Sequence, residues 1–266
     1  MITSLTLLIL SLVALYIGAG WLVQGSSALA LKAKISPLVV GLTIVAFGTS
    51  APELVVSLNA TLSGQGDIAI GNIVGSNIFN IGVILGVSAT ICPLQVKKQL
   101  LRIEIPVMLA ATVLFTILFW NGTLGRTEGL FFLTGIIIYT IFSLFYSRKH
   151  GTEGPSQELE EQPKHWAVDT LAIVGGLVVL VFASRLLVDN AVSIAKELGV
   201  SEAVIGLTIV AAGTSMPELA TSIVAAYKRK TDIAIGNIVG SNLFNILTIA
   251  GSCALIHPIE AKNVNY

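Results

Sequence analysis

The chain has 266 residues, of which 54% are hydrophobic and 11% are charged, with a mean hydropathy of +0.87. A soluble domain carries about 25% charged residues, so the composition excludes an ordinary soluble protein and indicates a membrane protein. The formal net charge is zero, which by itself identifies no partner, and we expect no nucleic acid to bind.

Apolar stretches recur along nearly the whole chain, and a membrane-spanning helix needs roughly 20 largely apolar residues. The first stretch lacks a basic start and a small-residue cleavage site, so we expect a retained helix and not a signal peptide. The pattern predicts an all-α, polytopic protein that crosses the lipid bilayer. Its eight predicted spans are 5–30, 36–63, 68–91, 103–120, 128–146, 167–191, 201–227 and 232–255.

Two sequence blocks occur twice within these spans. The block "GLTIVAFGTSAPEL" begins at Gly41, and "GLTIVAAGTSMPEL" begins at Gly206. The block "DIAIGNIVGSNIFNI" begins at Asp67, and "DIAIGNIVGSNLFNI" begins at Asp232. Both pairs have the same offset of 165 residues (206 minus 41 and 232 minus 67), so one ancestral unit appears twice.

The distribution of Lys and Arg predicts the orientation, because basic residues collect on the cytoplasmic side. With eight spans, eleven lie on one face and three on the other, which places the N-terminus outside. Five spans precede the second unit, so it enters the membrane from the opposite face. Such inverted repeats are typical of secondary transporters, whose sites lie near the bilayer midplane. We expect a five-span repeat at 1–146, a cytoplasmic linker at 147–166, and a three-span repeat at 167–266.

Glu53 and Glu218 fall near the middle of apolar segments, where a carboxylate costs roughly 2.5 kcal/mol or more unless it meets a cavity or a partner. The repeated blocks contain no Lys or Arg at a comparable depth. Pro52 and Pro217 remove a backbone donor and loosen the adjacent turn, which frees carbonyl oxygens. An ion or a proton is therefore the expected partner, in an oxygen-only cluster that gains hydroxyls from Thr49, Ser50, Thr214 and Ser215.

The second block adds a polar stripe on one helix face in each copy, because its members recur every four residues. Hard cations such as Ca2+ take six to eight oxygen ligands, which carboxylates, carbonyls, hydroxyls and amides supply. The nitrogen and sulfur ligands that zinc or copper prefer are missing from the blocks. The stripes consist of Asn72, Ser76 and Asn80 in one copy and Asn237, Ser241 and Asn245 in the other.

Some of these residues also have structural explanations. The GxxxG patterns at Gly71 with Gly75, and at Gly236 with Gly240, favour close helix packing. A single membrane Asn often only bonds a neighbouring helix. An intramembrane hydrolase would need a base beside a serine, but the histidines lie in the linker or near a terminus, so we expect no enzyme.

The segments "GTSAPE" with "GNIVGSNIFN", and "GTSMPE" with "GNIVGSNLFN", resemble the α-repeats of the Na+/Ca2+ exchanger family. The resemblance implies an antiporter of the plasma membrane that exchanges Na+ for Ca2+ by alternating access. It implies no cofactor, and a sliding gate made by the first and sixth spans.

By motif position, the resemblance also implies roles for twelve residues. Glu53 and Glu218 would bind both ions, and Thr49 and Thr214 would offer backbone carbonyls to Ca2+. The remaining residues would form flanking Na+ sites (Ser50, Ser215, Ala46 and Ala211, helped by Ser76 and Ser241) or line the centre (Asn80 and Asn245).

This chain departs from the family pattern in two ways. Some members carry Asp where this chain has Asn245. Members generally have ten spans, and the counterparts of spans four and five would begin near residue 268, beyond Tyr266. Three alternatives stay open: an H+/Ca2+ exchanger, because two protons would also neutralise the glutamates; an exchanger of another cation for Ca2+; and an ion-binding form that does not transport.

Overall fold

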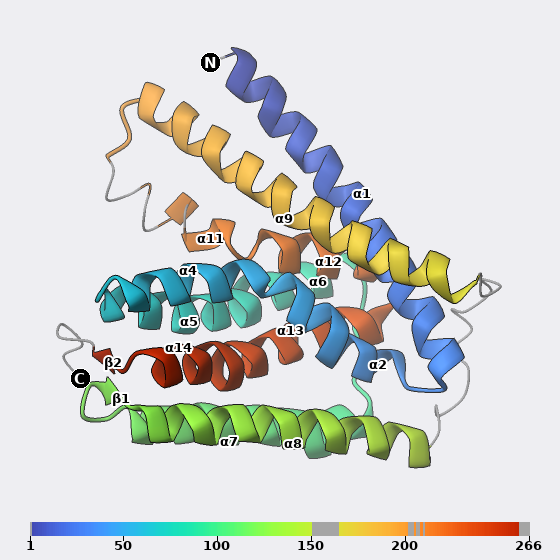
Figure 1. The fold of residues 1–266 in the computed structure, drawn as a ribbon. Coiled ribbons are helices and arrows are strands. Elements are labelled where there is room, and N and C mark those ends of the chain that lie inside the picture. Colours follow the sequence, from blue (N-terminus) through green and yellow to red (C-terminus); the bar gives the residue numbers. More distant parts are fainter. Residues whose placement is uncertain (1, 151–164, 202–204, 206–207, 210, 261–266) are drawn as a thin grey trace.

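The computed structural model describes residues 2–150, 165–201, 205, 208–209 and 211–260 (Figure 1). Within these residues the first repeat holds eight α-helices, three π-helical segments (η) and one short strand. They are α1 (Ile2–Ala33), α2 (Pro37–Val40), η1 (Gly41–Val45), α3 (Ala46–Thr49), α4 (Ala51–Leu62), α5 (Gly66–Phe79), η2 (Asn80–Ile84), α6 (Leu85–Ile91), η3 (Leu100–Glu104), α7 (Ile105–Leu118), β1 (Thr123–Leu124) and α8 (Arg126–His150).

The second repeat follows the same order where it is described. Residues 151–164 of the predicted linker lie outside the described residues, as does part of the predicted span 201–227. The described elements are α9 (Trp166–Glu197), α11 (Ala211–Gly213), α12 (Met216–Tyr227), α13 (Thr231–Phe244), η5 (Asn245–Ala250), α14 (Gly251–Ile256) and β2 (Ile259–Glu260).

The described helices confirm the predicted all-α, polytopic fold. Six helical stretches are long and apolar enough to cross a membrane, and a bent pair at residues 37–62 makes a seventh. They match seven of the eight predicted spans to within a few residues. Among the described residues, the structure adds π-helical segments and a two-residue strand pair, β1 with β2, which the sequence pattern did not predict.

The bent pair is broken where the sequence places proline. Pro52 lies in the first turn of α4, where its missing N–H costs nothing, and Ser50 leaves helical geometry with φ −82° and ψ 9°. The two halves meet at 47°. Ser215 has nearly the same conformation, φ −87° and ψ 10°, directly before α12 and Pro217. In both repeats a new helix, α4 or α12, therefore begins directly after the same serine of the motif.

Helices α1 and α9 pack along each other as a long pair that crosses the rest of the bundle obliquely (Figure 1). Glycine permits the close approach: a Cβ on Gly176 would lie 2.7 Å from the carbonyl oxygen of Gly18, and one on Gly25 would lie 2.7 Å from that of Asp169. Lys32 near the end of α1 forms an ion pair with Asp169. The pair is thus joined both by packing and by charge.

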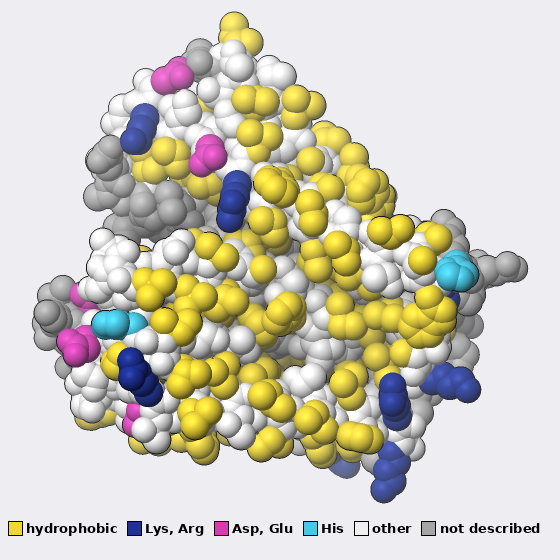
Figure 2. Space-filling view, viewed as in Figure 1, with side chains coloured by type: hydrophobic (Ala, Val, Ile, Leu, Met, Phe, Trp, Pro, Cys, Tyr) yellow, Lys and Arg dark blue, Asp and Glu magenta, His cyan; other side chains and the backbone are white. Residues whose placement is uncertain are grey.

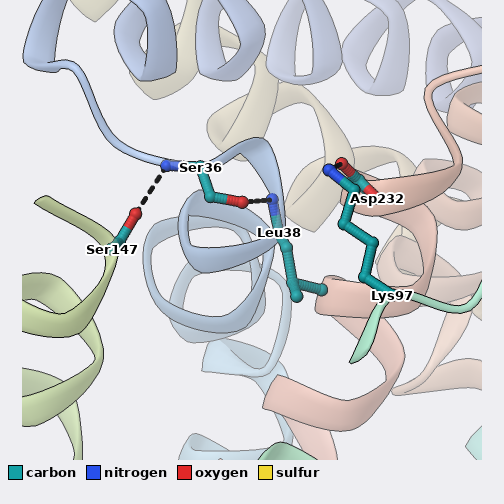
Figure 3. A network of polar contacts seen from close by, with 5 residues as sticks. All are labelled: Ser36, Leu38, Lys97, Ser147 and Asp232. Carbon is teal, nitrogen blue, oxygen red and sulfur yellow. Dashed lines mark hydrogen bonds and ion pairs between the residues drawn. The ribbon is translucent and has the colours of Figure 1, made fainter. Parts of the chain in front are cut away.

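Several loops meet at one end of the bundle (Figure 3). The backbone N–H of Ser36 donates to Ser147 Oγ at 2.7 Å, and the Ser36 hydroxyl caps α2 through Leu38 N. Nearby, Lys97 forms an ion pair with Asp232 at the start of α13. The loops after α1 and before η3, the end of α8 and the start of α13 thus share one end, as the alternation of spans requires.

The opposite end carries the strand pair. Thr123 pairs with Glu260 and Leu124 with Ile259 in antiparallel register. On the molecular surface, hydrophobic side chains cover the middle of the face shown in Figure 2, and charged side chains lie mostly toward its edges. This distribution suits a protein whose middle faces lipid hydrocarbon.

Candidate ion-binding site

The helix breaks set the depth and direction of the two glutamates. Glu53 and Glu218 lie in the first turns of α4 and α12, immediately after the interruptions, and each side chain is 1% exposed. The two carboxylates are close enough for their charges to interact. The local sequence thus places two carboxylates at the N-terminal ends of half-helices, where the helix dipole favours negative charge.

Each glutamate receives a hydrogen bond from the opposite repeat. Ser50 Oγ donates to Glu218 Oε1 at 2.8 Å, and Ser215 Oγ donates to Glu53 Oε1 at 2.9 Å. Ser215 Oγ also lies 3.3 Å from Ser76 Oγ. These reciprocal contacts bring side chains of both repeats into one buried centre.

The second oxygen of each glutamate has no hydrogen-bond partner in the described part of the chain. The same holds for the amide oxygens Asn80 Oδ1 and Asn245 Oδ1, and for Ser241 Oγ. An unsatisfied buried polar group costs about 1–3 kcal/mol, and more when it is charged. The centre therefore holds buried oxygen acceptors that protein hydrogen bonds leave free.

The polar stripes divide into two kinds of residue. Asn72 Nδ2 donates to the Glu53 carbonyl oxygen at 3.2 Å and to Ser57 Oγ at 2.9 Å, while its Oδ1 accepts from Thr214 Oγ1 at 3.4 Å. Asn237 makes the equivalent bonds to the Glu218 carbonyl, Ser222 and Thr49. In Asn72 and Asn237 both the NH2 group and the oxygen are therefore hydrogen-bonded, whereas in Asn80 and Asn245 the oxygen has no partner among the described residues.

Three other predicted site residues, Ala46, Thr49 and Thr214, are linked to this centre by hydrogen bonds. The carbonyl oxygen of Ala46 accepts from Ser50 N at 3.0 Å and from Thr49 Oγ1 at 3.4 Å. Thr49 is fully buried, and Thr214 is partly buried. Ala211 begins α11, and its side chain lies outside the described residues.

Four residues of the site region were missed by the sequence analysis. Ser57 and Ser222 accept from the stripe asparagines Asn72 and Asn237, while Asn77 and Asn242 contact the amides of Asn245 and Asn80 across the repeats. The sequence does carry a signal for these four residues. Each is a polar residue inside an apolar helix, and each pair recurs at the same offset of 165 residues.

The donor set at the centre is made of oxygen. No cluster of three or more His, Cys, Asp or Glu side chains occurs among the residues that the structure describes, so carboxylate chemistry rests on the two glutamates. Carboxylate, amide and hydroxyl oxygens suit hard cations such as Ca2+.

Known proteins match the chain over nearly its full length. The family model described as sodium/calcium exchanger protein matches residues 3–145 and 168–266. The inner membrane protein YrbG of Escherichia coli (strain K12) is 39% identical over 272 residues, which cover 100% of this chain and 84% of that protein. The sodium/calcium exchanger MaX1 of Methanosarcina acetivorans is 31% identical over 97% of this chain and 85% of its own length.

A solved structure gives the same result in three dimensions. The sodium-calcium exchanger NCX_Mj superposes with a TM-score of 0.85 at 33% identity, covering 99% of this chain and 86% of that chain. The duplicated blocks, the paired helix breaks and these matches agree. The chain belongs to the sodium/calcium exchanger family of multi-pass membrane antiporters, which exchange other cations for Ca2+ and are not enzymes.

Proposed function

We propose that this chain exchanges Na+ for Ca2+ across a membrane by alternating access, with the ions held between the two repeats. The observation that carries the proposal is the set of buried oxygens without a hydrogen-bond partner among the described residues: Glu53 Oε2, Glu218 Oε2, Asn80 Oδ1 and Asn245 Oδ1. Leaving them unpaired is costly, and a bound cation offsets that cost.

In the proposed Ca2+-bound state, the two glutamates bind the ion together with the backbone carbonyls of Thr49 and Thr214. The Thr hydroxyls hold these two residues in place across the repeats, because they donate to Asn237 and Asn72. Flanking Na+ ions would use a further set of oxygens: the hydroxyls of Ser50, Ser215, Ser76 and Ser241, and the carbonyls of Ala46 and Ala211.

Exchange follows from the charge of the site. Two ionised glutamates give a charge of −2, which one Ca2+ or a set of Na+ ions neutralises, whereas both together would leave an excess of buried positive charge. Ca2+ and Na+ therefore exclude each other. The empty site keeps its charge, which opposes the change between its outward-facing and inward-facing states. Only the ion-loaded forms therefore make this change.

The moving part in this proposal is the α1–α9 pair. Its glycine-mediated packing and the Lys32–Asp169 ion pair favour motion of the two helices as one body. Leu177 of α9 packs over Gly48, just before the first helix break, where a Cβ would lie 2.4 Å from it. A shift of α9 along this contact would open or close access to the site.

We also propose the orientation that the basic residues predict, with the N-terminus outside, the linker 147–166 cytoplasmic, and the plasma membrane as the location. The chain's own cysteines test it, because Cys92 is partly exposed in the loop after α6 and Cys253 is buried. A membrane-impermeant maleimide should label Cys92 in inverted vesicles and leave it unlabelled in right-side-out vesicles. The reverse pattern would mean that the N-terminus is inside.

Uptake of 45Ca2+ into Na+-loaded proteoliposomes tests the transport function. We expect an outward Na+ gradient at fixed pH to drive uptake, and Glu53→Gln to abolish it. Glu128→Gln is the matched control, because this carboxylate caps the start of α8 by accepting from Gly125 N, away from the site.

The other outcomes separate the alternatives. Uptake driven by a pH gradient and indifferent to Na+ would identify an H+/Ca2+ exchanger. Uptake driven by a gradient of a different cation would identify that cation as the counter-ion. Ca2+ binding without any uptake would mean that the chain binds the ion but does not transport it.

A further inference from the structure

Two asparagines, Asn77 and Asn242, contact the two asparagines whose oxygens are left free in the site. Asn245 Nδ2 donates to Asn77 Oδ1 at 2.9 Å, and Asn80 Nδ2 donates to Asn242 Oδ1 at 3.0 Å. Each bond joins one repeat to the other. Neither Asn77 nor Asn242 has a role in the function proposed above.

The hydrogen bonds of Asn77 determine which way the amide of Asn245 points. Asn77 Nδ2 donates to the backbone carbonyl of Asn242 at 3.3 Å, and a carbonyl can only accept. Asn77 must therefore turn its oxygen to Asn245. Asn245 therefore donates through its NH2 group, which leaves its own oxygen without a hydrogen-bond partner among the described residues.

The amide of Asn80 is fixed in the same way by a different acceptor. Asn242 Nδ2 lies 3.7 Å from Met108 Sδ of α7, and a thioether sulfur can only accept. Asn242 therefore presents its oxygen to Asn80, which turns its NH2 group to Asn242. The free atom of Asn80 is again the oxygen.

We propose that Asn77 and Asn242 are positioning residues, which hold Asn245 and Asn80 in the amide orientation that offers oxygen to the cation. The opposite orientation would point an NH2 group, with its partial positive charge, at the ion. The inference rests on the proposed function, because it assumes that Ca2+ binds at this centre.

Equilibrium binding of 45Ca2+ to the purified, full-length chain tests the proposal. Asn77→Leu and Asn242→Leu are close in shape to asparagine and remove the amide partner. Because loss of a group that orients a metal ligand typically weakens affinity by 10–100-fold, we expect each to raise the Kd for Ca2+ about tenfold.

A crossed set of double variants distinguishes positioning from a general structural effect. Asn245→Asp replaces the amide with a carboxylate whose two oxygens are equivalent, so its orientation no longer matters. In that background we expect Asn77→Leu to change the Kd less than about twofold, while in the Asn80→Asp background it should keep its effect of about tenfold. Asn242→Leu should show the reverse, with its effect lost in Asn80→Asp and kept in Asn245→Asp.

Equal effects of Asn77→Leu in both Asp backgrounds would overturn the positioning role, because damage to the fold does not depend on which ligand is changed. Should Asn77→Leu fail to fold, Asn77→Ser removes the same amide with a smaller polar side chain and enters the same cycle. Wild-type protein that binds no Ca2+ would contradict the proposed function itself. If the wild-type protein binds Ca2+ and Asn77→Leu changes the Kd equally in both Asp backgrounds, the positioning role is wrong while the proposed function stands.

Discussion

Two helices that share a duplicated block have very different surroundings. Residues 66–91 (α5, η2 and α6) and residues 231–256 (α13, η5 and α14) both contain the block "DIAIGNIVGSN", which starts at their second residue. In the most apolar part of each helix, 33% of the residues are buried in the first and 94% in the second. Burial of the helix therefore does not follow from the repeated sequence.

The difference comes from two groups of segments that pack on the second copy: α7 and α8, and residues 37–49. A Cβ on Gly236 or Gly240 would lie 2.5 Å from the carbonyl oxygen of Leu38 or Leu42, whereas one on Gly71 or Gly75 would meet no atom within 4 Å. A Cβ on Gly251 would lie 3.1 Å from the Gly129 carbonyl oxygen and 3.2 Å from Phe132 Cβ, both in α8. Its counterpart Gly86 is exposed and would meet no atom within 4 Å. Both repeats contribute to the buried polar centre, whereas the segments that pack around each copy decide how far it is enclosed.

The largest expected effect tests the equivalence of the two repeats at the site. Glu53→Gln and Glu218→Gln should each weaken 45Ca2+ binding by more than about 100-fold, since loss of a charged ligand exceeds the 10–100-fold cost of a second-layer partner. The two losses should be similar, because each carboxylate has the same reciprocal serine contact. Near-normal binding in one variant would show that the repeats contribute unequally.

The next effect tests whether α8 stabilises the enclosed copy. Phe132 is fully buried, while its neighbour Phe131 is 57% exposed. Phe132→Ala should cost about 3–5 kcal/mol of stability through the cavity that it leaves. Thermal unfolding in detergent would measure this, with Phe131→Ala as the matched control. Equal losses in melting temperature would contradict the packing argument.

A smaller effect compares the equivalent glycines directly. Gly251→Leu would force a side chain against the backbone of Gly129 and should cost about 1–3 kcal/mol, as overpacking usually does. Gly86→Leu points into open space among the described residues and should leave the melting temperature nearly unchanged. A loss at Gly86 as large as that at Gly251 would mean that another chain or segment covers this face in the folded protein.

The smallest effect returns to the part that the repeats share. Ser57→Ala and Ser222→Ala each remove one acceptor from an engaged asparagine, whose amide keeps its bond to the glutamate carbonyl. Hydrogen bonds between membrane helices average about 0.6 kcal/mol, so both variants should lose little stability, and by similar amounts. Thermal unfolding would measure both variants. A large loss of stability in only one of them would show that the two repeats also differ around the glutamates.

The sequence by itself determined the spans, the duplication and the two glutamates. These features are local: apolar length defines a membrane helix, and proline directly before Glu53 or Glu218 interrupts it. The oxygen-rich composition around them indicated a hard cation, and the structure brings Ser50, Ser215 and Ser76 to the same centre.

Only the tertiary structure decided which polar atoms are free to bind an ion. Asn72 and Asn80 are the same residue type on one predicted helix face, yet Asn72 is saturated by Glu53, Ser57 and Thr214, while the oxygen of Asn80 is unpaired. Asn80 donates to Asn242, and the Oδ1 of Asn72 accepts from Thr214. Both partners lie more than 140 residues away in the chain, so no local sequence pattern predicts these bonds. The same holds for the burial of residues 231–256 by α8. This burial depends on which segments pack against the helix, and the repeated sequence of the helix does not determine them.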